Sequence, residues 1–224
     1  MADSAAPIPA DAAPEARVAE ESAFYHEAAL NAAWTGSRLA IGALTFLFGA
    51  FAFAYFYLES SNPHGMWYPK GFRGPYAWEG ALIMALVAGS AAVQTVVLQR
   101  LKAGAKSVWQ WGALAALVCG VVAVGLQIWE LLSLPFQPGS GGFASVFTGF
   151  YPVALVTWLA AMIWLEILIV RAAKIPAISF VEQPPTYAEA FDIQRFQASL
   201  SSFTAVWNFL ALIAVAFWLM FYVR

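Results

Sequence analysis

The sequence predicts an all-α fold: a polytopic membrane helix bundle with five transmembrane helices, the N-terminus cytoplasmic and the C-terminus outside. Three observations lead to this fold class. Hydrophobic residues make up 62% of the 224-residue chain and charged residues only 11%, against roughly 25% charged in a soluble domain. Five apolar runs reach the roughly 20 residues that a helix needs to cross the hydrocarbon core. None of these runs alternates apolar and polar residues as transmembrane strands do.

The chain divides into three parts. Residues 1–16 are rich in Ala, Pro and Asp and lack an apolar core of secretory length, which predicts a disordered tail. Residues 17–37 predict a short amphipathic helix at the membrane surface or against a neighbouring subunit. Residues 38–224 form the transmembrane domain. Its predicted spans, none containing Lys, Arg, Asp or Glu, are residues 39–58, 80–99, 107–129, 143–165 and 200–223.

The distribution of Lys and Arg predicts the orientation. With the N-terminus inside, eight of these residues lie in inner segments and three in outer ones, which is the positive-inside bias. In the inner segment 171–199, Pro176 and Pro184-Pro185 precede a polar stretch, and this predicts a loop followed by a short interfacial helix. A net charge of −2 provides no basic field for nucleic acid.

Side chains that carry chemistry are few. The two histidines, His26 and His64, lie outside the predicted spans and in different compartments, so this chain by itself predicts no haem, copper or other metal site. A single cysteine, Cys119, excludes an intramolecular disulfide. The sequence contains no P-loop, serine-nucleophile elbow or zinc-binding helix pattern. We therefore expect no cofactor in this chain.

Three polar residues near or inside the spans are candidates for specific interactions. Glu130 ends the third span at the outer interface, about 36 Å along the helix from Lys106. It is either a solvated helix end or a hydrogen-bonding site that anchors the next loop. Glu166, at the inner end of the fourth span, is interpreted as a solvated end that pairs with Arg171 or with a partner subunit. Asn208 lies about 12 Å into the fifth span, and its amide is expected to find an interhelical partner.

A series of motifs follows one another through residues 38–224. The aromatic first span, TFLFGAFAFAYFYLESS, precedes a Trp-Tyr-Pro loop, and the third and fourth spans are joined by the string from Gln127 to Phe150. This order resembles subunit III of the haem-copper terminal oxidases, in the five-helix form that lacks the family's first two helices. The family's string reads Gln-x-x-Glu, Pro-Phe, Gly, Ser, Phe, Thr-Gly-Phe, and its last helix carries Trp-His-Phe. The residues that carry the resemblance are Trp67, Pro69, Gln127, Glu130, Pro135, Phe136, Ser145, Thr148, Gly149, Phe150, Trp207, Asn208 and Phe209.

The resemblance implies a non-catalytic accessory subunit of the respiratory chain in the bacterial inner membrane. Such a subunit packs against catalytic subunit I and lies in a complex with subunit II. It also binds membrane phospholipid and supports proton uptake during oxygen reduction. Haem and copper are implied in those partner subunits, with no catalytic, cofactor-binding or metal residue in this chain. The electron donor of the complex would be cytochrome c or quinol.

The departures from the family pattern share one feature. Thr45 stands where many members carry a buried glutamate, Tyr151-Pro152 replaces His-Gly, Asn208 replaces histidine and Ala211 replaces aspartate. A proton-handling role is therefore not carried over to these four positions. Their loss also fits a non-pumping enzyme, so an accessory subunit of a nitric oxide reductase is the alternative. A small transporter is a weaker one, because the spans show no repeat, buried charge or broken helix.

Overall fold

The structure is a computed structural model that describes residues 14–62, 65–68, 71–176, 180 and 187–223, with side chains from Glu21 onward and, in the last helix, from Glu189. These residues form five α-helices and no strand: α1 (Pro14–Ser60), α2 (Ala77–Lys102), α3 (Lys106–Ser133), α4 (Gly142–Lys174) and α5 (Tyr187–Trp218), which a π-helical turn, η2 (Leu219–Val223), continues. All five are long and apolar enough to cross a membrane. The predicted all-α, five-span fold is confirmed, and the chain is a multi-pass membrane protein. The predicted tail lies largely outside the described residues.

Two helices begin well before the spans that the sequence predicted. Helix α1 is continuous over 47 residues, so the amphipathic segment 17–37 is the first part of this helix and not a separate element. Gly36 lies at the expected break, but one glycine costs a helix only about 1 kcal/mol, which is too little to end it. The polar stretch after Pro184-Pro185 likewise begins α5 itself and is not a separate interfacial helix.

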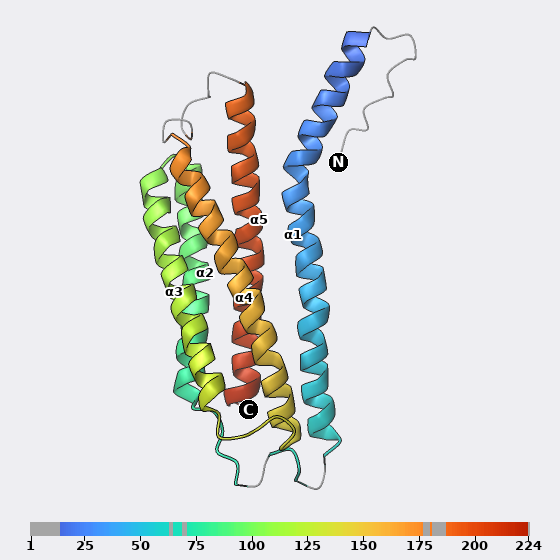
Figure 1. The fold of residues 1–224 in the computed structure, drawn as a ribbon, viewed down its shortest axis with the longest axis vertical. Coiled ribbons are helices and arrows are strands. Elements are labelled where there is room, and N and C mark those ends of the chain that lie inside the picture. The colour runs from blue at the N-terminus through green and yellow to red at the C-terminus, as the bar shows by residue number, and fades with distance from the viewer. Residues whose placement is uncertain (1–13, 63–64, 69–70, 177–179, 181–186, 224) are drawn as a thin grey trace.

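The helices run side by side, with α1 at the edge of the bundle (Figure 1). Helix α2 packs against α3 and α5, α3 also packs against α4, and α1 packs mainly against α5 and α4. Only 11% of the apolar window of α1 is buried, against 33–39% in the other four helices. Helix α1 is therefore the peripheral helix of this chain.

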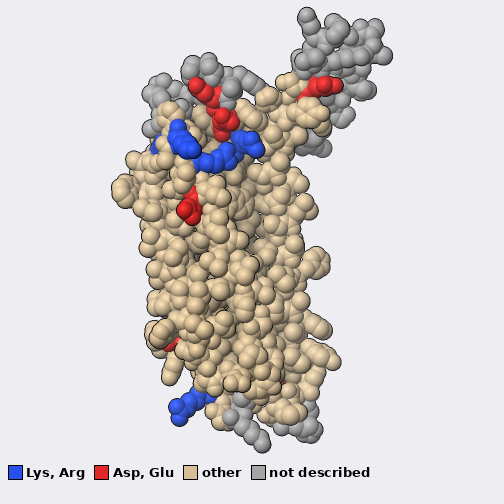
Figure 2. Space-filling view, viewed as in Figure 1, with Lys and Arg blue, Asp and Glu red and all other residues tan. Residues whose placement is uncertain are grey.

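The charged side chains gather at the two ends of the bundle. Figure 2 shows a belt of Lys and Arg at the end where α1 begins, while the middle of the molecule is uncharged over most of its surface. We call this end the basic end; among the described helices it holds Arg100, Lys102, Lys106, Arg171 and Lys174. The amine of Lys106 donates a hydrogen bond to the carbonyl oxygen of Ile175 there. The start of α3 is thereby tied to the end of α4.

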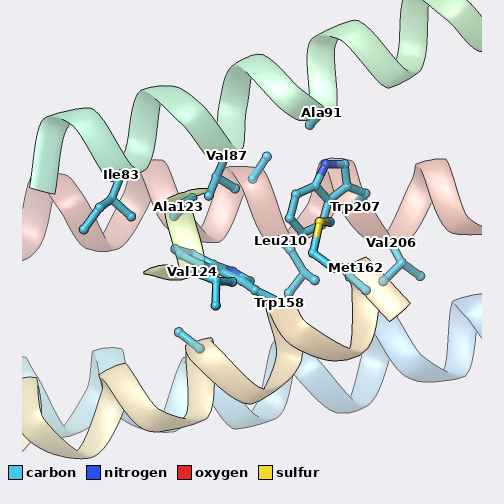
Figure 3. Packing of buried hydrophobic residues seen from close by; sticks show 14 of the residues in the cluster. Ile83, Val87, Ala91, Ala123, Val124, Trp158, Met162, Val206, Trp207 and Leu210 are labelled. Carbon is cyan, nitrogen blue, oxygen red and sulfur yellow. The ribbon is translucent and has the colours of Figure 1, made fainter. Parts of the chain in front are cut away.

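The interior of the bundle is packed by side chains from α2, α3, α4 and α5 (Figure 3). Close approach of α3 to α4 depends on Gly120, because a Cβ at that position would overlap the sulfur of Met162. One polar chain crosses this apolar interior: Trp207 Nε1 donates to Ser90 Oγ at 3.1 Å, and Ser90 Oγ donates to the Ala116 carbonyl at 2.8 Å. The chain links α5, α2 and α3.

The opposite end of the bundle is closed by packed aromatic rings. Phe150 stacks on Phe217 with ring centroids 4.0 Å apart, and Trp67 meets Tyr55 edge-on at 5.0 Å. We call this group the aromatic cluster and this end the aromatic end. Aromatic pairs of this kind stabilise beyond their burial, by roughly 0.5–1.5 kcal/mol each. Its buried members are Tyr55, Trp67, Phe136, Phe143, Phe147, Phe150, Phe217 and Phe221.

Candidate functional site

The most polar buried site of the described residues lies beside the aromatic cluster. Glu130, near the end of α3, is only 2% exposed. Its Oε1 accepts a hydrogen bond from the Tyr222 hydroxyl at 2.5 Å, and the Tyr222 hydroxyl is also hydrogen-bonded to that of Tyr151. We call these three residues the Glu–Tyr–Tyr chain. It connects α3, α4 and the turn that ends the last helix.

Local sequence features place the two tyrosines. Tyr222 lies in the π-helical turn η2, a widened turn that is frequent at functional positions. Its ring passes over Gly80 of α2, where a Cβ would come within 2.6 Å of the ring atoms Cε1 and Cε2. Tyr151 precedes Pro152, a proline inside α4, which removes one backbone hydrogen bond from the helix. Gly80 therefore leaves room for the Tyr222 ring, and Pro152 alters the backbone bonding of α4 next to Tyr151.

The Glu–Tyr–Tyr chain lies between two hollows. A surface pocket of about 160 Å³ is lined by Glu130 together with Arg73, Glu79 and other residues at the ends of α2 and α3. A smaller hollow of about 20 Å³, also partly open, is lined by Tyr222 and Tyr151. The hydrogen-bonded side chains thus lead from the surface pocket to the interior of the bundle.

A few polar groups interrupt the mostly apolar lining of this smaller hollow. Gln127 and Trp158 both line it, and each has a buried polar atom, Oε1 and Nε1 respectively, with no hydrogen-bond partner among the described residues. The amide of Gln127 makes one long contact, from Nε2 to the Tyr151 carbonyl at 3.5 Å. A water molecule needs about 10–15 Å³ of such space and two or more polar partners. The hollow has the size and the polar groups to hold one water molecule.

This arrangement decides between the two interpretations of Glu130. The carboxylate is buried, so the solvated helix end is wrong. Glu130 is a hydrogen-bonding site, but its partner is Tyr222 of the last helix. The second carboxylate oxygen, Oε2, is buried without a hydrogen-bond partner among the described residues. In chemical terms the site fastens three helix ends together through hydrogen bonds among one carboxyl and two phenol groups.

Most predicted residues between the third and fourth spans lie around this site. Phe136 and Phe150 belong to the aromatic cluster, and Pro135 lines the surface pocket. Gly149 faces α1, since a Cβ there would meet Phe51 at 3.4 Å. The hydroxyls of Ser145 and Thr148 bond to carbonyls of their own segment, at 2.9 and 2.7 Å. The structure thus brings Gln127, Glu130, Pro135, Phe136 and Phe150 together. Ser145 and Thr148 instead donate hydrogen bonds to backbone carbonyls at the start of α4.

The remaining predicted residues lie elsewhere. Trp67 is buried in the aromatic cluster, and its carbonyl accepts the Phe143 amide hydrogen at 3.0 Å; Pro69 is outside the described residues. Trp207 is buried in the bundle interior. The predicted interhelical partner of Asn208 is Thr95 of α2, with Nδ2 and Thr95 Oγ1 3.0 Å apart. Phe209 packs against the core without joining the site.

Sequence reasoning missed several polar residues of the bundle, among them Thr95. Tyr222 and Ser90 make two of the interhelical hydrogen bonds described above, and the fully buried Gln94 has both amide atoms unpaired among the described residues. Ser90 and Gln94 carried a signal, because each is a polar residue within an apolar span. The sequence offered almost no indication of a role for Tyr222, because tyrosine is common at the ends of transmembrane spans.

Two departures from the family pattern have a definite place in the structure. Tyr151, at the position of the family histidine, bonds to Tyr222 and so belongs to the Glu–Tyr–Tyr chain. Thr45 is exposed and its hydroxyl donates to the Ile41 carbonyl of its own helix at 2.7 Å. Within the described part of the chain, no group of three or more His, Cys, Asp or Glu side chains is arranged to hold a metal ion.

Neither a protein-family model nor a curated protein sequence matches this chain.

Proposed function

We propose that this chain is the accessory subunit III of a haem-copper terminal oxidase, in a five-helix form. The observation that carries the proposal is the motif string from Gln127 to Phe150. Five of its members lie around one buried site at the aromatic end, where Gln127 faces α4 and Phe136 packs on Phe143 and Phe147. A string that is spread over two helices and a loop, yet brings five of its members to one site, supports a structural role for the string.

In this proposal the chain is a scaffold in the bacterial inner membrane. It packs against catalytic subunit I, with subunit II in the same complex, and those partners hold the haem and copper. The peripheral α1, of which so little is buried within the chain, presents an apolar surface to membrane lipid or to another subunit. The basic end faces the cytoplasm, as the positive-inside rule requires. Bound phospholipid and support of proton uptake follow from the family resemblance.

The second candidate is an accessory subunit of a nitric oxide reductase. It rests on the residues at the family's ionisable positions: Tyr151 and Asn208 are both engaged in hydrogen bonds between helices. Side chains that do not ionise near physiological pH and that have structural partners suit a complex that does not pump protons.

Purification of the native complex tests both candidates. We would place an affinity tag at the N-terminus, ahead of α1, extract the membranes with a mild detergent, and identify the co-purified subunits by mass spectrometry. A haem-copper catalytic subunit that consumes oxygen is the expected result. A catalytic subunit that reduces only nitric oxide would select the second candidate. Recovery of the chain without any haem-copper subunit would refute both.

A further inference from the structure

Glu166 of α4 is a carboxylate on the outer, apolar side of a transmembrane helix. The residue is exposed, and it lies among the exposed side chains of Ile163, Ile167 and Val170, which are 56%, 52% and 52% accessible. Figure 2 shows an acidic patch set into the uncharged surface beyond the belt of Lys and Arg. Helix α4 continues for two more turns, to Lys174, so Glu166 is not the helix end that the sequence indicated.

Contacts between α3 and α4 give the depth of Glu166. Lys106 bonds to the carbonyl of Ile175, and Met162 lies over Gly120. The two helices are antiparallel, so residue 106 lies level with residue 175 and residue 120 with residue 162. Interpolation between these two contacts places Glu166 level with about residue 116 of α3. That level is some ten residues, or about 15 Å, from the start of α3 at the basic end. The carboxylate therefore lies within the apolar zone, where an ionisable group is costly unless it has a partner.

The chain offers Glu166 no cationic partner among its described residues. Arg171 is five residues further along α4, which turns it about 140° away around the helix. Lys174 lies about 80° around the helix from Glu166 and about 12 Å further along the axis, well beyond the 4 Å of an ion pair. Glu166 makes no hydrogen bond or ion pair with any other described residue. A cationic partner for Glu166 would therefore have to come from another molecule.

We propose that this face of α4, lined by Leu159, Ile163, Glu166, Ile167 and Val170, is the docking surface for a transmembrane helix of another protein that carries Lys or Arg at the same depth. Charge complementarity selects this occupant. A second copy of the chain would have to bring Arg38 of α1, which is exposed and lies near the same depth, and a crosslink to a second copy would overturn the proposal. A lipid headgroup lies at the level of the Lys and Arg belt and would reach Glu166 only by entering the hydrocarbon region.

Site-specific photo-crosslinking in native membranes tests the proposal. We would place p-benzoylphenylalanine at Ile163 and, as the matched control, at Val118 of α3, which is 53% exposed and lies at nearly the same depth. Position 163 is expected to give an adduct with a membrane protein, and peptide mapping is expected to find Lys or Arg within one helical turn of the crosslinked residue. Position 118 is expected to give lipid adducts. Lipid adducts alone at position 163, or a protein helix without a basic residue there, would overturn the proposal.

A charge substitution tests the role of the carboxylate itself. Glu166→Gln keeps the shape of the side chain and is expected to lower the crosslink yield at position 163 about tenfold, the factor that corresponds to about 1.4 kcal/mol. Glu21→Gln, at an exposed position of α1, is the control and should leave the yield unchanged. An undiminished yield in Glu166→Gln would contradict the proposal. The inference does not depend on the complex being an oxidase, because a protein adduct with any other basic membrane helix supports it equally.

Discussion

Glu130 and Tyr222, 92 residues apart in the sequence, meet through a 2.5 Å hydrogen bond from the phenol to the carboxylate. The bond ties the last turn of α3 to the end of the chain's final helix. The Tyr222 hydroxyl is also hydrogen-bonded to Tyr151 of α4. Tyr222 therefore links the end of the last helix to both α3 and α4 at the aromatic end.

Tyr222→Phe should destabilise the folded bundle by about 1–3 kcal/mol, the usual cost of leaving a buried polar atom without its partner. Phenylalanine keeps the ring and removes only the hydroxyl that bonds to Glu130. Unfolding by SDS titration of the protein in mixed micelles would measure the change. Tyr57→Phe is the control, because Tyr57 is 57% exposed and its loss of a hydroxyl should change stability by less than about 0.5 kcal/mol. Equal effects of the two substitutions would argue against a special role for the buried bond.

Glu130→Ala should weaken retention of the chain in its complex without changing the haem spectrum. The substitution removes the acceptor that fixes the end of η2 to α3, so the aromatic end loses its rigid shape while the catalytic partner is untouched. The ratio of this subunit to its partners after mild detergent extraction measures the effect. Glu21→Ala, at an exposed site, provides the comparison. An unaltered subunit ratio in Glu130→Ala would count against the structural role.

Gly80→Ala should destabilise the bundle by about 1–3 kcal/mol, the usual cost of overpacking. The added methyl group would come within 2.6 Å of the Tyr222 ring atoms Cε1 and Cε2, and it would push the tyrosine away from Glu130. Gly89→Ala on the same helix is the matched control, because a Cβ there meets nothing within 4 Å; it should be neutral or stabilise the helix by up to about 1 kcal/mol. Thermal unfolding of both variants in one detergent distinguishes them, and a stable Gly80→Ala protein would disprove the close approach.

Ser90→Ala should cost about 1–3 kcal/mol, since it leaves the buried indole N–H of Trp207 without an acceptor. The fluorescence spectrum of the protein should also change, because the environment of one buried tryptophan is altered. Ser145→Ala is the control: its hydroxyl is exposed and bonds only to the nearby Gly141 carbonyl. Should Ser90→Ala prove as stable as this control, the hydrogen bond would contribute nothing measurable.

Thr95 and Asn208 should show a small, measurable coupling in a double-mutant cycle. Their side chains bond across the α2–α5 contact at 3.0 Å, and interhelical hydrogen bonds of this kind average about 0.6 kcal/mol in membranes. The summed destabilisation of the two single variants, Thr95→Ala and Asn208→Ala, should therefore exceed the destabilisation of the double variant by about this amount. Strict additivity in the SDS titration would show that the pair does not interact.

How far the sequence alone reaches can be judged from particular residues. The apolar runs predicted all five helices correctly because lipid offers a backbone no hydrogen-bond partner, so a chain that crosses it must satisfy its own amides in helices. The same reasoning required a partner for the amide of Asn208. It did not identify Thr95, and it placed the first and last helix starts wrongly, because neither Gly36 nor the polar stretch at the start of α5 interrupts a helix.

What the sequence by itself determined is therefore the number of spans, their composition and the list of polar residues that need partners. Only the tertiary structure decided which partners they have. Glu130 bonds to Tyr222 because the ends of α3 and α5 meet beside α4, and Glu166 is left uncovered because its face of α4 points away from the bundle. The physical reason is that helix formation depends on local backbone bonding and apolar surface, whereas the rotation and register of each helix depend on side chains far apart along the chain.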